Sequence, residues 1–446
     1  MSTLTDHAVQ FILNTEWVTL PAEIQHQSKR CLLDTLGALL AGMETPVGEL
    51  MSRVSTIQYR GDEATVLVSG KRTSAAGAAL ANGFAGNALD IDDGYRLVKG
   101  HPGACVLPVT LAAGELAARC SGKDFLSALV VGYEIGIRAG VIRHATYDMY
   151  HSSGSWGAIA GAAAAGKLLG FDADTLLHAM GAAEYHAPIA PMMKCIDVPS
   201  MGKDSIGWGT MVGMLSALMA EDGFTGIHPL FADAPDAGWV ESLGRRFEIM
   251  NLYFKPYCAC RWGQPAVAGA LHIAREYQLK PDNIETIIVD TFEAAARLSC
   301  TPPKDTEEAQ YNLAFPVAAA LLDGEVGPRQ VLPPRLNDPA VHALMGKVKT
   351  CVDDRFEKIF PAKAGAEVTV TTTDGREFKS GQMEAIWEPP DTLPSDKELE
   401  AKFKWLVEPV LGKKQTDRLV AMIWTFEEQD DLCALIDYCI KREVAA

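Results

Sequence analysis

The chain has 446 residues, of which 48% are hydrophobic, so it can bury large cores and is expected to form two or at most three domains. Asp and Glu outnumber Lys and Arg by 57 to 40, and the formal net charge of −17 argues against nucleic acid or an anionic membrane surface as a partner. The start, MSTLTDHAVQF, lacks a basic segment followed by an apolar one, and no stretch approaches about 18 uninterrupted apolar residues. We therefore expect a soluble, cytoplasmic protein.

Helical periodicity dominates the first half of the chain. Pro21 opens one helix, which Gly42 ends. Further helices are predicted over 74–87, 109–120, 123–140, 155–170, 172–180 and 206–220, with a short strand or connector at 63–69. The spacing Gly161-x4-Gly166-Lys167 resembles a phosphate-binding loop, but Leu168 stands where a Ser or Thr is needed. We therefore interpret 155–170 as a buried helix.

The pattern changes after Phe254. Residues 284–292 predict a strand, 338–349 an amphipathic helix that includes Val348, and 367–383 a hairpin around Asp374-Gly375. Helical periodicity returns from Ser395 through Val444. The prediction is a mainly α protein, in which residues 1–253 and 391–446 form a large all-helical domain and residues 254–390 form an inserted α+β lid domain.

The stretch from Ala88 to Pro108 concentrates titratable side chains in an otherwise small and apolar sequence. They are Asp90, Asp92, Asp93, Arg96, Lys99 and His101. Glycines and Pro102 interrupt any helix, which predicts a constrained loop of the kind that carries chemistry, although a charged surface loop is the plain alternative. The aspartates lack a calcium-loop pattern, and the ten Cys lack zinc-like spacing, so we expect no metal site.

Four pairs of basic or ambivalent residues lie in loops rich in Gly, Pro or Ser. They are Lys99 with His101, Tyr147 with His151, Lys194 with Lys203, and Lys255 with Arg261. Loops at one end of a helical domain can converge on a pocket beside a second domain. Such a group of cations in an acidic protein suits a small substrate with two or more carboxylates.

The chemistry of these side chains suggests roles. Arg261 is expected to grip one carboxylate through two hydrogen bonds, and Lys255 or Lys203 to stabilise charge that develops during proton abstraction. His151 or a desolvated Lys203 is the candidate base. The plain alternatives are a packed or surface histidine, and for Lys203 a surface lysine at a helix start.

Several stretches together resemble the MmgE/PrpD family over the whole chain. They are LLDTLGALLAG at 32–42, NALDIDD and GHPG within 87–103, YHSSGSWGAIAGAAAAGKLLG at 150–170, MGKDSIGWG at 201–209, KPYCACRWGQPAV at 255–267 and AALLDG at 319–324. The resemblance implies an all-helical large domain and an α+β lid with the active site between them, in a homodimer. It also implies action on polycarboxylates without an organic cofactor, by members that include dehydratases, decarboxylases and an epimerase.

The resemblance extends to the pocket of the family. Five residues match its pocket positions, namely Asp90, His101, His151, Lys203 and Lys255. Three neighbours depart: Gly94 stands where the family often has Thr, Gln264 where a His is usual, and Phe315 where a Tyr is common. These departures remove groups able to protonate a leaving hydroxide, which favours an epimerase over a dehydratase.

Our main hypothesis from the sequence is a cofactor-independent isomerase that epimerises a substituted succinate and resembles iminodisuccinate epimerase. Lys203 and His151 are the expected proton-transfer pair, with Tyr147 as a substitute, and alanine at position 203 is expected to abolish turnover with little effect on thermal unfolding. The remaining assignments are that Lys255, Arg261, His101, Gln264 and Lys99 bind substrate and that Asp90 orients His101 or tunes its pKa. Two alternatives stay open: a polycarboxylate lyase of the 2-methylcitrate dehydratase or cis-aconitate decarboxylase type, and a binding protein without catalysis.

Overall fold

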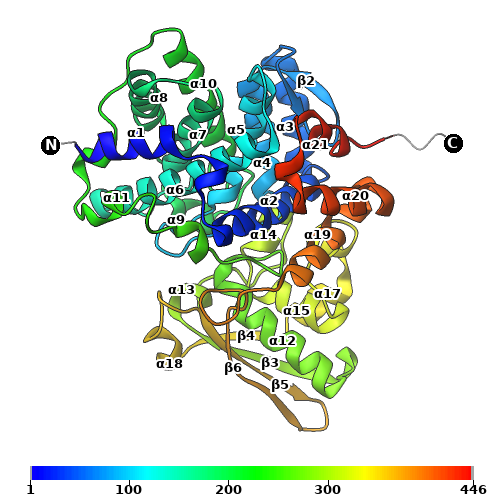
Figure 1. Ribbon diagram of the computed structural model, residues 1–446. Helices are drawn as coiled ribbons and strands as arrows, with labels where there is room; N and C mark the ends of the chain where they lie inside the picture. Colours follow the sequence, from blue (N-terminus) through cyan, green and yellow to red (C-terminus); the bar gives the residue numbers. More distant parts are fainter. Residues whose placement is uncertain (1–2, 443–446) are drawn as a thin grey trace.

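A computed structural model describes residues 3–442, which form a mainly α-helical fold with one small mixed sheet, as predicted (Figure 1). The helices of the first half are α1 (Leu4–Asn14), α2 (Ala22–Gly42), α3 (Pro46–Gln58), α4 (Ala75–Asn87), α5 (Pro102–Leu116), α6 (Gly122–Thr146), α7 (Gly154–Leu168), α8 (Ala173–His186), α9 (Met192–Asp197), α10 (Ile206–Glu221) and α11 (Gly238–Glu241). Strands β1 (Ala64–Val66) and β2 (Lys71–Thr73) form a short antiparallel pair.

Small side chains allow the central helices to pack closely. Helix α7, which contains the sequence AIAGAAAAG, contacts α5, α6, α8 and α10. A Cβ atom at Gly213 of α10 would lie 2.6 Å from the Ala158 carbonyl oxygen of α7, so only glycine fits at this crossing. Residues 161–167, which resemble a phosphate-binding loop, therefore lie within a buried helix, as predicted. Lys167 Nζ donates to the Leu13 carbonyl at 2.9 Å.

Helix α6 is the one helix within residues 3–442 that is long and apolar enough to cross a membrane. Of its most apolar window, 94% is buried inside the fold, as is usual for a core helix of a soluble protein. Its Glu134 and Arg138, both fully buried, form an ion pair one turn apart. The helix therefore forms part of the protein core.

The second part of the chain builds a four-stranded sheet in the order β4-β3-β5-β6. Its elements are α12 (Gln264–Tyr277), β3 (Ile284–Thr291), α13 (Glu293–Ala296), α14 (Thr306–Gln310), α15 (Ala314–Asp323), α16 (Pro328–Val331), α17 (Pro339–Met345), β4 (Val348–Val352), α18 (Asp354–Glu357), β5 (Gly365–Thr372) and β6 (Glu377–Glu384). Helix α12 packs on β5 and β6. The hairpin predicted at 367–383 is confirmed, and Gly375 turns with φ of 81°.

Two boundaries differ from the sequence predictions. The helix predicted over 338–349 ends at Met345, and Val348 begins β4, which pairs in parallel with β3. Residues 348–352 contain β-branched side chains that suit this pairing. The helix predicted from Val109 begins at Pro102, because a proline is well tolerated in the first turn, where its missing N–H has no partner to lose.

The last helices, α19 (Asp396–Leu411), α20 (Lys413–Trp424) and α21 (Cys433–Tyr438), return to the first part of the chain. Helix α19 packs along α2, and Lys402 Nζ donates to Asp34 Oδ1 at 2.5 Å (Figure 1). Residues 443 and 444 of the predicted C-terminal helical segment lie outside the described residues. The division into 1–253 with 391–446 and 254–390 stays a prediction.

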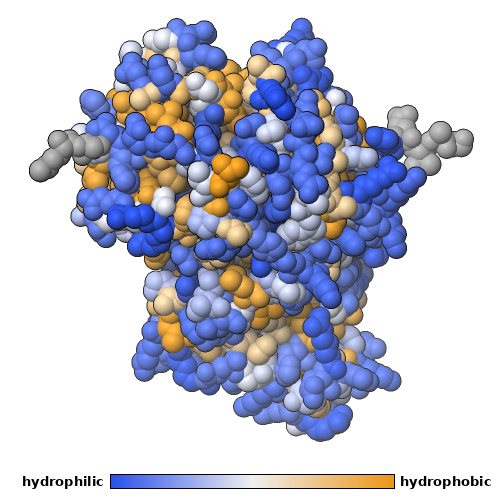
Figure 2. Space-filling view, in the orientation of Figure 1, coloured by the Kyte–Doolittle hydropathy of each residue, from blue (hydrophilic) through white to orange (hydrophobic). Residues whose placement is uncertain are grey.

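Figure 2 shows a mainly hydrophilic face with separate hydrophobic patches. Exposed apolar side chains occur on and around α8 and α10, where Tyr185 is 71% exposed and Trp208 46% exposed. The homodimer implied by the family resemblance also remains a prediction.

Candidate active site

A cavity of about 1040 Å³ lies between the loop that joins α4 to α5 and the segments around residues 253–262, 360–362 and 389–390. Five of the predicted site residues line it, namely Asp90, Lys99, His101, Lys255 and Arg261. They come from distant parts of the chain, since Asp90 and Lys255 are 165 positions apart. The fold therefore joins the charged loop at 88–101 to the basic segment at 255–261.

Backbone pairing brings these two segments together. Gly94 and Tyr253 exchange both backbone hydrogen bonds, each at 2.9 Å, and Lys255 follows two residues later. Asp90 and Lys99 have positive φ angles of 51° and 50°, so the loop contains left-handed residues that are not glycine. Such conformations need support from surrounding contacts and are concentrated at functional sites.

Asp90, His101 and Lys255 form the polar floor of the cavity. Asp90 Oδ1 lies 2.6 Å from Lys255 Nζ and 3.6 Å from His101 Nε2. Burial opposes both charges, but Lys255 lowers the pKa of Asp90, and Asp90 in turn raises the pKa of Lys255. Lys255 is thus a fixed cation at neutral pH, suited to stabilise negative charge and not to act as a base.

His101 occupies the N-cap position of α5 between several carboxylates. Its Nδ1 lies 2.9 Å from Asp92 Oδ2, while Nε2 lies 3.9 Å from Asp204 Oδ2. Burial disfavours the imidazolium, but Asp92 and Asp204 together raise the pKa of His101; the same imidazolium lowers the pKa of Asp92 to about 2. The carboxylate nearest to His101 is therefore Asp92, whereas the expected partner, Asp90, is bonded to Lys255.

Asp93 holds the start of α5 from behind the floor. Its Oδ1 accepts from the Gly103 N–H at 2.9 Å, and its Oδ2 accepts from the Tyr133 hydroxyl at 2.6 Å. Burial and the nearby Asp34 raise the pKa of Asp93 to about 7. Asp93 thus fixes the helix that carries His101 without lining the cavity.

Three side-chain atoms of Asp90, Asp92 and His101 lie within 4.8 Å of one another, a spacing that a metal ion can use. The Lys255 ammonium already provides a cation 2.6 Å from Asp90 Oδ1. A metal ion bound there would face an adjacent positive charge, so this cluster is explained by its own ion pairs.

Lys203, expected as a base, is buried outside the cavity lining. Its Nζ donates to the Asn87 carbonyl at 2.5 Å and to Gln310 Oε1 at 2.7 Å, and it lies 5.9 Å from the centre of the Tyr311 ring. Gln310 donates in turn to the Ala88 carbonyl at 2.9 Å. In this structure Lys203 ties the end of α4 to α14.

His151 and Tyr147, the other expected members of the proton-transfer group, do not line the cavity either. The His151 ring stacks on His144 at 4.0 Å, and its Nδ1 lies 2.6 Å from Ser155 Oγ. Burial lowers the pKa of His151 to about 4, so the ring is neutral at pH 7. Tyr147, the C-cap residue of α6, is 47% exposed, and the Arg143 guanidinium lies over its ring.

Arg261 reaches the cavity but already holds a carboxylate. Its Nε and Nη2 donate to the two carboxylate oxygens of Glu388 at 2.7 and 2.8 Å. Lys99 lies at the rim, 5.1 Å from the centre of the Tyr150 ring. Gln264, expected as a substrate ligand, instead donates to the carbonyls of Tyr257 and Ala259 and stays outside the lining. It thereby fixes the loop from which Arg261 extends.

The cavity still has hydroxyl groups on its wall, although Gly94 and Phe315 lack the hydroxyls expected from the family pattern. A Cβ atom at Gly94 would lie 2.2 Å from the hydroxyl oxygen of Tyr253, so the Tyr253 phenol fills the space that a Thr side chain would need. Phe315 lies fully buried in the core, while Tyr311 lines the cavity. The inference that lost acid groups favour an epimerase is therefore not supported by the geometry.

Several cavity residues were missed in the sequence analysis. They are Tyr150, Asp204, Tyr253 and Tyr311. Glu388, which does not line this cavity but pairs with Arg261, was also missed. Tyr150 precedes His151 and Asp204 follows Lys203, so the expected positions were one residue away from those at the wall. Nothing in the local sequence distinguishes Glu388 from the other acidic residues of its segment, because its partner is 127 positions away.

The chain is similar to curated proteins over almost its full length. It is 27% identical to the "cis-aconitate decarboxylase-like protein oryM" of Aspergillus oryzae, over 97% of this chain and 98% of that protein. It is also 27% identical to human cis-aconitate decarboxylase, over 95% of this chain and 91% of that protein, and 22% identical to the cis-aconitate decarboxylase of Aspergillus terreus. Decarboxylases are lyases, so these relatives overturn the expected assignment as an isomerase, and nothing among them points to iminodisuccinate epimerase.

Two family models divide the chain between them. The MmgE/PrpD N-terminal domain matches residues 6–249, and the MmgE/PrpD C-terminal domain matches residues 257–428. The boundary between the two matches falls beside Lys255, where the charged loop and the basic segment meet. The chain belongs to the MmgE/PrpD family.

Proposed function

We propose that this protein is a polycarboxylate lyase that decarboxylates an unsaturated tricarboxylate, as the names of its relatives state for cis-aconitate. The observation that carries the proposal is the floor of the cavity, where Lys255 and His101 lie on either side of the same Asp90 carboxylate oxygen. One group is a fixed cation and the other an acid with a raised pKa. Decarboxylation needs both kinds of group.

The proposed reaction breaks the bond between one carboxylate carbon and the neighbouring carbon of the substrate. The electron pair of that bond stays on the carbon skeleton, where a conjugated carboxylate takes up the charge, and carbon dioxide leaves. A proton then adds to a skeleton carbon, so one proton is consumed for each carbon dioxide released. The protein has to stabilise the dienolate and to deliver that proton.

Lys255 is the group that we assign to the dienolate. Its ammonium is held by Asp90 at 2.6 Å and has a raised pKa, so it offers a preorganised charge in a buried place. A fixed donor of this kind is worth about 2.7–4 kcal/mol of transition-state stabilisation.

His101 is the group that we assign to proton delivery. Its Nδ1 lies 2.9 Å from Asp92, which does not line the cavity, whereas Asp90 and Asp204 near Nε2 do line it. Nε2–H therefore lies on the substrate side. Proton donation by a positioned side chain contributes roughly 10²–10⁴ in rate.

The test is proton NMR of the purified protein with cis-aconitate in deuterium oxide, together with measurement of released carbon dioxide. We expect new alkene signals, one deuterium incorporated per turnover and an equal amount of carbon dioxide. His101→Gln and Lys255→Met should each lose about 10²-fold or more in kcat. His272→Gln, at an exposed position of α12, is the matched control and should retain full activity. Absence of carbon dioxide from cis-aconitate and from its alkyl-substituted forms would refute the proposal.

A further inference from the structure

The carboxylate that pairs with Arg261 is Glu388, which belongs to a separate segment of the chain. Both Nε and Nη2 of Arg261 bond to Glu388, and the two side chains are 13% and 10% exposed. The Arg261 guanidinium also lies 5.4 Å from the centre of the Tyr253 ring, which faces the cavity. Glu388 occupies the Nε/Nη2 edge of Arg261 and neutralises its charge, so a substrate carboxylate can bind this edge only when Glu388 leaves it.

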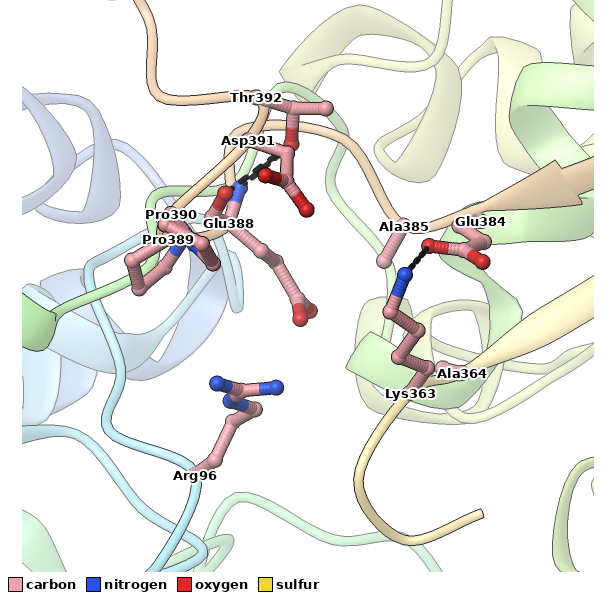
Figure 3. A pocket seen from close by; sticks show the side chains of 10 residues that line it. All are labelled: Arg96, Lys363, Ala364, Glu384, Ala385, Glu388, Pro389, Pro390, Asp391 and Thr392. Carbon is pink, nitrogen blue, oxygen red and sulfur yellow. Dashed lines mark hydrogen bonds and ion pairs between the residues drawn. The ribbon is translucent and has the colours of Figure 1, made fainter. Parts of the chain in front are cut away.

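A second cation lies on the other side of Glu388. A smaller cavity of about 70 Å³ is lined by Glu388, Arg96, Lys363 and Thr392, and Figure 3 shows the Arg96 guanidinium directed toward the Glu388 carboxylate. Arg96 donates to the Ala362 carbonyl at 2.5 Å and forms no ion pair among residues 3–442. It also lines the larger cavity. Glu388 therefore has one arginine as partner and a second arginine facing it.

The backbone around Glu388 is fixed by two hydrogen bonds, and its buried side chain borders the small cavity. The Glu388 N–H donates to Thr392 Oγ1 at 3.0 Å, and the Thr392 N–H donates to the Glu388 carbonyl at 3.0 Å. Lys363, the other cation of the small cavity, is already paired with Glu384 at 2.8 Å (Figure 3). Among the cations that line the small cavity, Arg96 is therefore the one without a carboxylate partner among the described residues.

We propose that Glu388 is a specificity-determining residue: it holds Arg261 in the unliganded protein and yields this arginine to a substrate carboxylate by turning to Arg96. The inference rests on the proposed function, because it requires a polycarboxylate in the larger cavity. Glu388 competes with every incoming carboxylate, so it weakens the binding of ligands that gain little else. A tricarboxylate that also contacts the floor has enough carboxylates to displace it.

Calorimetric titration with tricarballylate, a saturated tricarboxylate, tests this exchange on the full chain. Glu388→Gln leaves Arg261 unpaired, so we expect tricarballylate to bind about tenfold more tightly than to the unmodified protein. Glu384→Gln is the matched control, because it removes a carboxylate from the same small cavity without touching Arg261, and its affinity should not change. If the unmodified protein binds tricarballylate but Glu388→Gln binds it no more tightly, the exchange is refuted while the proposed function stands. If the unmodified protein binds no tricarballylate and releases no carbon dioxide from cis-aconitate, the proposed function itself fails.

A double-mutant cycle separates exchange from direct contact. Arg96→Met should weaken tricarballylate binding about fivefold or more in the unmodified background, because displaced Glu388 loses its new partner, and should have no effect when Glu388→Gln is present. An equal loss in both backgrounds would mean that Arg96 binds the ligand itself and would overturn the exchange. Should Glu388→Gln not fold, Glu388→Asp keeps the charge but shortens the reach, and tightening by that variant supports the exchange whereas unchanged or weaker binding refutes it.

Discussion

His101 lies between two carboxylates, with Nδ1 2.9 Å from Asp92 Oδ2 and Nε2 3.6 Å from Asp90 Oδ1. Asp92 is completely buried, and its Oδ1 accepts a hydrogen bond from Asn87 Nδ2 at 2.9 Å. Its charge is therefore held in place, and it raises the pKa of His101 against the effect of burial. The pKa of His101 is thus raised by a carboxylate that does not itself line the cavity.

Replacement of Asp92 by Asn should lower the pKa of His101, because burial then acts without its opposing charge. His101 is active as the protonated acid, so activity is present below its folded-state pKa and is lost as pH rises through that pKa. In a pH profile of kcat/KM for cis-aconitate, the alkaline limb of Asp92→Asn should move down by about one unit or more. Asp204→Asn, with its oxygen 3.9 Å away, should move it less. An unmoved limb would exclude His101 as the titrating group.

Replacement of Lys255 by arginine should lower activity, and replacement by methionine should lower it further. Lys255→Met removes the cation beside Asp90, and kcat should fall about 10²–10³-fold while a buried carboxylate loses its partner. Lys255→Arg keeps the charge but not the compact ammonium that reaches both the side chain and the carbonyl of Asp90. Steady-state kinetics with cis-aconitate should place the arginine variant between the other two. Equal activity of all three would remove Lys255 from the reaction.

Lys203→Met should lower both stability and activity. Its ammonium bonds to the Asn87 carbonyl and to Gln310 Oε1, so the substitution leaves Gln310 Oε1 without a donor at a cost of about 1–3 kcal/mol, while the Asn87 carbonyl keeps the Asp90 N–H. This differs from the expectation that an alanine at position 203 would leave thermal unfolding nearly unchanged. Denaturant unfolding of Lys203→Met measures the loss, with exposed Lys194→Met as the control. An unchanged free energy of unfolding would show that these bonds are replaced by water.

Asp93 should make the protein less stable as pH rises from about 4 to about 7. Its pKa is about 7 in the fold, where burial and Asp34 raise it above the ordinary value of 3.8. Between these values the folded state binds one more proton than the unfolded state, so stability falls with rising pH, by up to about 4 kcal/mol. Asp93→Asn stays neutral and should lack this contribution. The free energy of unfolding is measured for both proteins at pH 5 and pH 8. Relative to the unmodified protein, Asp93→Asn should be more stable at pH 8 than it is at pH 5. A constant difference would refute the raised pKa.

Gly94→Ala should disturb Tyr253, because the new Cβ would lie 2.2 Å from the phenol oxygen. We expect a loss of about 1–3 kcal/mol in stability and lower activity as the phenol leaves the cavity wall. In a Tyr253→Ala background the same alanine should cost little, since the conflicting ring is gone. Comparison of thermal unfolding in the four proteins measures this coupling. Equal costs in both backgrounds would locate the strain in the backbone at position 94.

The family and most helices follow from local sequence. Small residues at helical spacing, as in α7, and the Asp374-Gly375 turn are features that act over a few positions, and the structure has a helix and a hairpin there. The motifs around Asp90, His101 and Lys255 likewise predicted a polar cavity on adjacent loops, and all three side chains line it. The helix and the hairpin could be predicted because each motif fixes its own backbone, whereas the catalytic roles of the three side chains stay a prediction.

The partners of the charged groups were decided by the tertiary structure alone. Asp90 precedes Lys255 by 165 positions and Arg261 precedes Glu388 by 127, and no local pattern encodes such pairs. The same holds for Lys203 and His151, whose loops reach the cavity while their own side chains turn away and their neighbours Asp204 and Tyr150 line it. In a loop, two neighbouring side chains can point in opposite directions. The sequence by itself therefore determined which segments form the site, and packing determined which side chains line the cavity.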